Sequence, residues 1–538
     1  MAVERVWWKD GVHYQVYPRS FADSDGDGVG DLRGIIEHLD HLAWLGIDGV
    51  WLSPITVSPD ADWGYDVADY TGVQPGLGTL TDVDELIAEA DRRGLKIILD
   101  LVPNHTSIEH RWFVESRASR DNPKRDWYVW ADPKPDGSPP NNWLSTFGGP
   151  AWTLDETTGQ YYLHNFTAEQ PDLNWWNDEV RDEFDRILRF WFDRGVAGFR
   201  IDVAHVIVKD RELRDNPPVG ADDHWMHRLL GQKPVYTQCR PEVHEVHRRF
   251  RAVADAYDPP RMLVGETFVF DVPTVASFYG TGDELNLAFN IPLLHTPFEA
   301  KALRAVVEET EAEVPPGSWP VWTAGNHDLS RFPTRWGEGD PAKVRCALMM
   351  LLTLRGAAFL YYGDEIGMPD TDVPKERLRD PVGIRFHPLA GRDPARTPMQ
   401  WSAAPGGGFA SDPSVEPWLP YGDFASCNVE DQRRDPDSAL SLCRDLIGLR
   451  DAVPELRGGG YTTIEPTPEG MWAWRRGERV VVALNLADEP ASVDDVTGLL
   501  RICTRRERDG ERIEGVLELG PWEGAVVWLD GESRFALS

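Results

Sequence analysis

Cysteine is scarce in this sequence, and its placement excludes two kinds of site. The chain of 538 residues has five cysteines, an odd number, and no two of them show the CxxC spacing of zinc ligands or redox dithiols. They are Cys239, Cys346, Cys427, Cys443 and Cys503. We therefore expect reduced thiols rather than a disulfide framework, a zinc site or redox chemistry.

Long hydrophobic runs are also missing. No stretch reaches the roughly eighteen apolar residues that a membrane-spanning helix needs, so we expect no membrane span. The first ten residues already include charged side chains and lack the apolar core of a secretory signal. Together these two features predict a cytoplasmic protein.

Positive charge is in short supply. Lysine and arginine total 55 against 89 aspartates and glutamates, which gives a net charge of -34. Because such a chain repels nucleic acids and anionic membrane surfaces, we expect neither as a partner and expect a small neutral substrate instead. The same acidity is found in halophilic or merely very soluble proteins, so charge alone assigns no function.

The sequence does contain eight short apolar runs rich in β-branched residues, with longer helical patterns between them. The runs are residues 12–17, 46–52, 96–102, 195–203, 261–265, 284–290, 320–324 and 358–362. This alternation is typical of βα units in a parallel sheet. Eight units predict an α/β fold of the (β/α)8 TIM barrel type, with the chemistry at the carboxyl ends of the strands.

Two segments interrupt the βα pattern. Residues 104–176, between the third and fourth runs, are aromatic, rich in proline and asparagine, and far too long for an ordinary loop. They predict an inserted domain. Residues 368–401 have no sustained period and predict a loop-rich insertion that borders the mouth of the active site.

The last part of the chain changes to a strand pattern. From about residue 454, alternating runs at 470–475, 480–486 and 524–529 predict a small all-β C-terminal domain. The predicted division is 1–103 and 177–453 for the barrel, 104–176 for the inserted domain and 454–538 for the C-terminal domain.

Carboxylates follow three of the predicted strands. Asp202 comes two residues after Arg200, so both side chains point the same way, and the guanidinium is expected to keep Asp202 ionised as a nucleophile. Glu266 ends the fifth run and Asp328 follows the seventh. Crowding of like charges favours a protonated Glu266 as general acid. A lone aspartate at a strand end is more often a helix cap or a salt bridge, but three acids on three strand ends favour a catalytic site.

Four short motifs in order carry a family resemblance. They are DLVPNH at 100–105, GFRID at 198–202, GE at 265–266 and NHD at 326–328. With them the chain resembles glycoside hydrolase family 13, the α-amylase family, and within it the oligo-1,6-glucosidase and α-glucosidase branch. The resemblance implies Asp202 as nucleophile, Glu266 as acid/base, and Asp328 as the carboxylate that binds the sugar hydroxyls and stabilises the transition state.

Further motifs resemble that branch and imply a sugar pocket. They are DWGYD at 62–66, QPDLN at 170–174 and RTPMQW at 396–401. In the branch, Asp62 and Arg396 pair across the pocket floor, which admits only chain ends. Tyr65 covers an apolar face of the sugar. The other implied substrate-binding residues are His105, Phe147, Phe166, Arg200 and His327.

An acidic stretch after the first strand predicts a cation site. Residues 23–31 read DSDGDGVGD and place oxygen ligands at alternate positions, which suits Ca2+. Gly34 stands where an EF-hand has its bidentate glutamate, so an EF-hand switch is not expected. The resemblance implies a structural ion held by Asp23, Asp25, Asp27, Asp31 and the carbonyl of Val29. The alternative is a solvated acidic turn.

The motifs together predict a retaining, exo-acting α-glucosidase that needs no organic cofactor. Expected substrates are maltose and malto-oligosaccharides, with isomaltose and sucrose left open. In the branch that the chain resembles, Val directly after the nucleophile accompanies α-1,6 activity, so the resemblance implies that Val203 favours α-1,6 bonds. The following Ala204, His205 and Val206 depart from the oligo-1,6-glucosidase pattern. A second sugar in place of water would give transglucosylation. Two rivals remain: a transferring or isomerising enzyme such as trehalose synthase or a sucrose-converting relative, and a catalytically silent sugar-binding relative.

Overall fold

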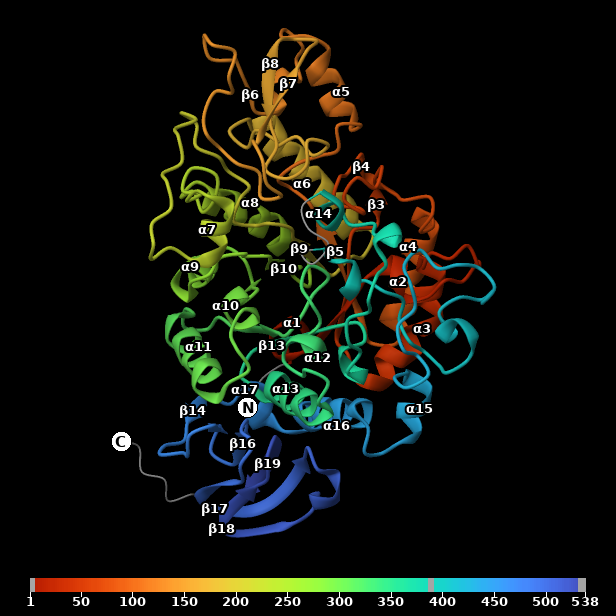
Figure 1. Ribbon diagram of the computed structural model, residues 1–538, viewed down its shortest axis with the longest axis vertical. Coiled ribbons are helices and arrows are strands. Elements are labelled where there is room, and N and C mark those ends of the chain that lie inside the picture. The colour runs from red at the N-terminus through yellow and green to blue at the C-terminus, as the bar shows by residue number, and fades with distance from the viewer. Residues whose placement is uncertain (1–4, 386–390, 531–538) are drawn as a thin grey trace.

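The computed structural model describes residues 5–385 and 391–530. Residues 1–4, 386–390 and 531–538 lie outside that description, and with them parts of the N-terminal stretch, of the predicted loop-rich insertion and of the predicted C-terminal domain. In Figure 1 a central body lies between a smaller orange segment above and a blue antiparallel sheet below. Among the described residues, no helix combines the length and the apolar character needed to cross a membrane.

Eight parallel strands form the central sheet. Their order is β11-β10-β9-β5-β2-β1-β13-β12, which describes a nearly closed barrel. The strands are β1 (Val12–Val16), β2 (Gly49–Leu52), β5 (Lys96–Leu101), β9 (Gly198–Ile201), β10 (Met262–Gly265), β11 (Leu287–Ala288), β12 (Val321–Thr323) and β13 (Ala357–Tyr361). Each coincides with one predicted run, so the predicted barrel is confirmed. β9 is shorter than predicted because Gly195, with φ of 102°, belongs to the turn that ends the preceding helix.

Alternation along the strands sets up the floor of the site. Ile98 of β5 and Val264 of β10 belong to an apolar cluster. Two residues further toward the carboxyl end, the side chains on the same face are Asp100 and Glu266. The acids therefore stand at the carboxyl end of the barrel, directly above apolar packing.

Amphipathic helices cover the outside of the barrel. The long ones are α3 (Leu32–Leu45), α4 (Leu80–Arg92), α6 (Asp178–Asp193), α8 (Val243–Asp255), α11 (Ala300–Glu313), α13 (Pro341–Thr353) and α16 (Ala439–Ala452). α4 begins at a capping box in which Thr79 and Asp82 each accept a hydrogen bond from the other's backbone N–H. Its residues Val83, Leu86 and Ala90 are buried, at the spacing of one helix face.

Short elements connect the long ones. They are α1 (Trp7–Asp10), α2 (Pro18–Phe21), β3 (Thr56–Val57), β4 (Asp69–Val73), η1 (Arg125–Trp127), α7 (Trp225–Leu230), α9 (Val272–Ser277), α10 (Ile291–Leu294), α12 (Phe332–Arg335), η2 (Asp364–Ile366), η6 (Pro405–Gly408), α15 (Val429–Arg434), α17 (Pro454–Gly458) and η7 (Arg506–Arg508). The segment predicted as a loop-rich insertion also contains η3 (Lys375–Arg377), α14 (Pro381–Arg385) and η5 (Asp393–Ala395).

The segment between β5 and β9 contains its own small sheet. β6 (Trp130–Ala131), β8 (Gln160–Leu163) and β7 (Trp152–Asp155) are antiparallel in the order β6-β8-β7, and α5 (Arg111–Ala118) lies beside them in Figure 1. Trp143, Trp152 and Leu163 form a separate core there. The N–H of Leu173 donates to the carbonyl of Asn104 at 2.9 Å, so both ends of the segment return to the barrel mouth.

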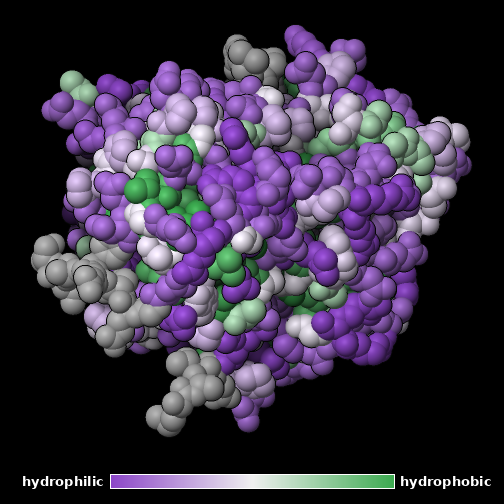
Figure 2. Space-filling view, turned by 90° about the horizontal axis from the view of Figure 1, so that it is seen from below, coloured by the Kyte–Doolittle hydropathy of each residue, from purple (hydrophilic) through white to green (hydrophobic). Residues whose placement is uncertain are grey.

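The C-terminal part is an antiparallel sheet, as predicted. It has the order β14-β15-β16-β19-β17-β18. The strands are β14 (Tyr461–Thr463), β15 (Met471–Arg476), β16 (Val480–Asn485), β17 (Ala491–Cys503), β18 (Arg512–Leu519) and β19 (Glu523–Leu529). β15, β16 and β19 match the predicted runs. β17 and β18 were not predicted because polar residues occupy most of their exposed positions, and the face seen from below is mostly hydrophilic (Figure 2).

Candidate active site

Three strand ends bring the predicted acids to one mouth of the barrel. Asp202 directly follows β9 and Glu266 directly follows β10, while Asp328 lies five residues beyond the end of β12. Asp202 and Glu266 are buried. Asp328 keeps 23% of its side chain exposed, so it lies nearest to solvent of the three.

Arg200 is the centre of the buried part of the site. Its Nη1 donates to Asp202 Oδ1 at 2.7 Å and to Asp100 Oδ1 at 2.8 Å. Its Nη2 lies 2.7 Å from Glu266 Oε2. The N–H of Val203 also donates to Glu266 Oε2, at 2.9 Å. One guanidinium therefore holds three carboxylates, from three neighbouring strands, within one pocket.

The electrostatics of Asp202 differ from the expectation. Burial raises the pKa of Asp202 well above its ordinary value, and Glu266 and Asp100 raise it further, whereas Arg200 lowers it. Burial likewise raises the pKa of Asp100 to about 6 against the opposing effect of Arg200. A single guanidinium does not offset the desolvation of three carboxyl groups, so this cluster favours retention of a proton.

Asp328 has the opposite environment. Its Oδ1 accepts from Arg392 Nη1 at 3.1 Å and from Arg396 Nη2 at 3.0 Å. Although burial acts to raise the pKa of Asp328, Arg392 and Arg396 outweigh it and hold that pKa below its usual range. Asp328 is therefore ionised at neutral pH, while Asp202 and Glu266 share a more crowded pocket.

The predicted pair of Asp62 with Arg396 is wrong. Asp62 Oδ1 accepts from Arg392 Nη2 at 2.6 Å, and Arg392 also binds Asp380 and Asp328. Arg396 instead donates to the carbonyl of His327 at 2.7 Å and to Asp328. The two arginines flank η5, and Arg392, four residues before Arg396, is the one that reaches across the pocket to Asp62.

His327 and Tyr65 lie parallel at the site. Their ring centroids are 5.3 Å apart with an angle of 6° between the planes, and Tyr65 Oη lies 2.6 Å from His327 Nε2. Tyr65 Oη also donates to Asp100 Oδ2 at 3.1 Å. Burial holds the pKa of His327 well below its usual value, so its ring is neutral. These contacts connect the Asp328 side of the pocket with the Arg200 side.

The segment between β5 and β9 contributes the remaining wall. Burial lowers the pKa of His105 to about 4, and its Nε2 lies 3.1 Å from Gln170 Nε2. Phe166 packs against the His105 ring at 5.0 Å and against Phe147 at 5.3 Å, between ring centroids. The Arg392 guanidinium lies 5.3 Å from the centre of the Phe147 ring. The predicted wall residues therefore reach the same pocket as Arg392.

A family model for the catalytic domain of alpha amylase matches residues 15–459. The chain belongs to the α-amylase family. It is 42% identical over 505 residues to a probable alpha-glucosidase from Rhizobium meliloti, covering 91% of each chain. It is 39% identical over 573 residues to an oligo-1,6-glucosidase from Heyndrickxia coagulans, covering 97% of this chain and 99% of that one.

Solved structures of this family share the whole fold. An alpha-glucosyl transfer enzyme, XgtA, superposes with a TM-score of 0.89 at 40% identity, covering 97% of this chain and 100% of that chain. The trehalulose synthase MutB from Pseudomonas mesoacidophila MX-45 has a TM-score of 0.90 at 34% identity, covering 98% and 100%. The resemblance to the α-amylase family is thus confirmed, and the chain is a glycoside hydrolase of that family.

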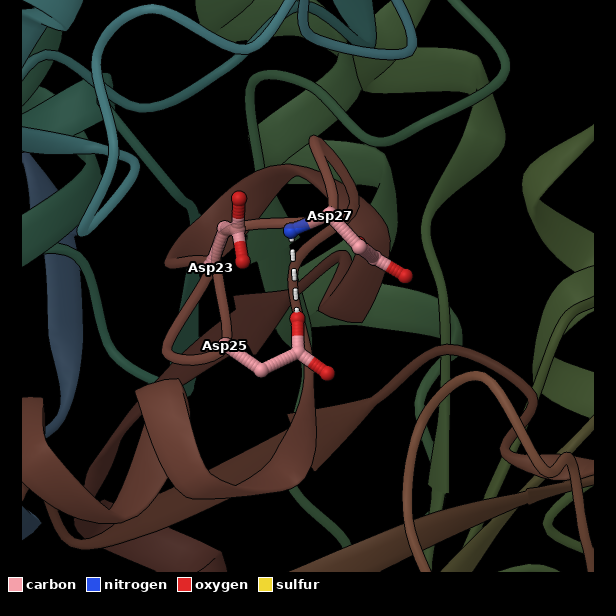
Figure 3. Close-up of side chains that lie close together, drawn as sticks. All are labelled: Asp23, Asp25 and Asp27. Atoms are coloured by element: carbon pink, nitrogen blue, oxygen red, sulfur yellow. Dashed lines mark hydrogen bonds between the residues drawn. The ribbon is translucent and has the colours of Figure 1, made fainter.

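Three of the predicted cation ligands lie close together in the loop after β1. Asp23, Asp25 and Asp27 have carboxylate oxygens within 4.8 Å of one another (Figure 3). The N–H of Asp27 donates to Asp25 Oδ1 at 3.2 Å, the contact drawn as a dashed line. Asp31 lies apart from this group, because it caps α3 by accepting from the N–H of Gly34 and binds Ser24. The clustered hard oxygen donors fit Ca2+, and the N-cap role explains why Asp31 does not join them.

Two residues of the α-amylase family site were missed from the sequence. Arg392 was passed over because it lies outside the RTPMQW motif, four residues before Arg396. Asp100 was quoted in a motif but given no role, although it accepts from Arg200, from Trp51 and from Tyr65. The alternation of β5 was the signal that could have placed Asp100 beside Arg200.

Proposed function

We propose that the protein is a retaining, exo-acting α-glucosidase that releases terminal glucose from maltose and short α-linked oligosaccharides. The observation that carries the proposal is that Arg200 binds both Asp202 and Glu266. Retaining glycosidases need their two carboxyl groups only about 5–5.5 Å apart. Binding by adjoining nitrogens of one guanidinium brings the two carboxylates close together, which supports a retaining arrangement.

The contacts leave one oxygen of each carboxyl group for chemistry. Asp202 binds Arg200 through Oδ1, and Glu266 binds Arg200 and Val203 through Oε2. In the proposed cycle Asp202 Oδ2 attacks the anomeric carbon while Glu266 Oε1 gives its proton to the leaving oxygen, forming a covalent β-glucosyl enzyme. Water then attacks the anomeric carbon, Glu266 takes its proton, and Asp202 leaves, so the α configuration is retained.

The opposite wall suits recognition of a terminal glucose. Asp328, Asp62 and Arg392 form a connected set of charged groups suited to sugar hydroxyls. Tyr65 and Phe147 supply ring surface for an apolar sugar face. Because Arg392 joins Asp62 to Asp328, this side of the pocket is bridged, which supports cleavage at chain ends rather than within chains.

Linkage and acceptor are the finer part of the proposal. Relatives are named alpha-glucosidase and oligo-1,6-glucosidase, and Val203 after the nucleophile leans toward α-1,6 bonds. We therefore propose maltose and malto-oligosaccharides as substrates, with isomaltose also cleaved, and transglucosylation when a sugar replaces water. The nearer rival is a sucrose-converting or transferring enzyme, which the structural neighbours named trehalulose synthase and alpha-glucosyl transfer enzyme favour.

Proton NMR of the first product tests the mechanism. With maltose, the first glucose released from the non-reducing end should be the α anomer, and initial β-glucose would refute retention. Free glucose as the main product supports hydrolysis, whereas trehalose, longer oligosaccharides, or isomers formed from sucrose support the rival. Substitutions D202N and E266Q serve as matched, nearly isosteric controls that remove the two proposed bond-making groups.

Three further features complete the proposal. Ca2+ bound by Asp23, Asp25 and Asp27 would fasten the loop after β1 and take no part in the chemistry. A reducing, cytoplasmic location is supported by five cysteines that are all free thiols. We also propose the domain division 1–103 and 177–453, 104–176, and 454–538, with the pocket between the first two.

A further inference from the structure

A buried glutamine lies behind the sugar-facing histidine. Gln15 is on β1, is 1% exposed, and its side chain points into the barrel. Its Nε2 lies 2.8 Å from His327 Nδ1 and donates to Ser53 Oγ at 3.1 Å. Gln15 contacts His327 from the side opposite to Tyr65, so it is placed to determine which ring nitrogen carries the proton.

The donors and acceptors around His327 are compatible with one tautomer. His327 Nε2 lies 3.4 Å from Asp328 Oδ2, and an ionised carboxylate only accepts hydrogen bonds. A bare Nε2 lone pair would face that negative charge, so Nε2 carries the proton. Nδ1 is then an acceptor and requires a donor, which the amide NH2 of Gln15 supplies.

The chain of donors continues without conflict. With Nε2 protonated, His327 donates to Tyr65 Oη, and Tyr65 in turn donates to Asp100 Oδ2 at 3.1 Å. In the reverse tautomer Tyr65 would have to donate to Nε2, which would take its proton away from Asp100. With Gln15 as donor, each group in the chain of Gln15, His327, Tyr65 and Asp100 donates a hydrogen bond to the next.

A small cavity accounts for the other end of the amide. Gln15 Oε1 has no protein partner, and neither has Arg200 Nε. Both residues line a cavity of about 10 Å³ beneath the carboxylates, about the space of one water molecule. An acceptor and a donor in one polar cavity suit a single bridging water, which would hold the amide with its NH2 toward His327.

We propose that Gln15 is a positioning residue that fixes His327 as its Nε2–H tautomer, so that Tyr65 keeps its own proton for Asp100 and no bare nitrogen lone pair faces Asp328. The proposal deepens the function proposed above and rests on it only for its effect on turnover. Gln15 itself does not touch the reacting atoms.

Neutron diffraction from deuterated crystals tests the tautomer without any activity. We expect a deuteron on His327 Nε2 and none on Nδ1, with the deuterated amide of Gln15 pointing at Nδ1. A deuteron on Nδ1 in the wild type overturns the proposal. In a Q15M variant, which removes the amide donor, the deuteron should no longer be confined to Nε2.

A double-mutant cycle on kcat/KM for p-nitrophenyl α-glucoside tests the route of the effect. Q15M should lower kcat/KM by about tenfold, the value of one buried hydrogen bond. In an H327N background the same change should cost less than about twofold, because its partner is gone. Equal losses in both backgrounds would show that Gln15 acts only through general packing.

A control variant separates these outcomes from loss of the fold. Gln432 is half-buried in α15, donates to the carbonyl of Ile366 and accepts from the N–H of Leu440, neither of which belongs to the site. Q432M should leave kcat/KM near the wild-type value. If the wild type shows no glucosidase turnover, only the proposed function is refuted. The tautomer of His327 is still decided by neutron diffraction.

Discussion

Arg392 provides the most discriminating test of the pocket, because its role distinguishes the structure from the sequence expectation. Its side chain is 11% exposed and binds Asp62, Asp328 and Asp380 at 2.6 to 3.1 Å. Arg396 shares only Asp328 with it. Replacing Arg392 by Met keeps a side chain of similar length but leaves the carboxylates of Asp62 and Asp380, which are both buried, without this partner.

The size of the effect follows from burial. Removing one partner of a buried ion pair costs about 3–5 kcal/mol, because the other charge stays desolvated. If part of that reaches the transition state, R392M should lower kcat/KM by at least about 100-fold, at about 1.4 kcal/mol per tenfold. The loss should shrink at low pH, because protonation neutralises the carboxyl of Asp62, whose pKa burial already raises.

Two double-mutant cycles make the measurement. D62N, R392M and their combination should give a coupling free energy of about 1.5 kcal/mol or more in kcat/KM for maltose. D62N with R396M should give a clearly smaller coupling free energy, since those residues make no direct contact and interact only through Arg392 and Asp328. A coupling between Asp62 and Arg396 as large as that with Arg392 would refute the reasoning, as would near-normal turnover of R392M.

Three further predictions concern the acids. D202N and E266Q should each lower kcat for maltose by about 10²-fold or more with an unchanged circular dichroism spectrum, since each removes a bond-making group. Burial raises the pKa of Asp364 from 3.8 to about 7, so between these pH values the folded state keeps a proton that the unfolded chain releases, and the free energy of unfolding falls as pH rises. In urea titrations D364N should flatten that decline and be more stable than the wild type above pH 7. An unchanged dependence of the free energy of unfolding on pH would contradict the argument. Chelation by EGTA should lower the melting temperature of the wild type but not that of D25A, and equal shifts would exclude a cation at Asp25.

The barrel could be predicted because its signal is local. Parallel strands buried on both faces read as short apolar runs, and all eight runs became strands. The three acids could be located for the same reason, because each follows a strand end. β17 and β18 escaped because one face of each is exposed and polar, so their composition resembles that of turns.

Pairings over long sequence distances could not be predicted. The contact of Asp62 with Arg392 joins residues 330 positions apart, and the sequence offers two arginines four positions apart for it. Only the three-dimensional structure distinguishes between them. Asp31 is a similar case, since an aspartate before a helix serves equally as an N-cap or as a ligand, and the structure uses it as the cap.

The site consists of two halves with opposite electrostatics, and this division suits the proposed reaction. Around Arg200, burial raises the pKa of Asp202 and of Asp100, so the cluster favours one retained proton, which the proposed cycle assigns to Glu266. Around Asp328, two arginines dominate and keep a full negative charge, as stabilisation of an oxocarbenium-like transition state requires. His327 and Tyr65 join the halves through neutral hydrogen bonds. Because His327 and Tyr65 are neutral, the proton can stay on the Arg200 side and the negative charge on Asp328. A charged histidine at position 327 would offset the charge of Asp328.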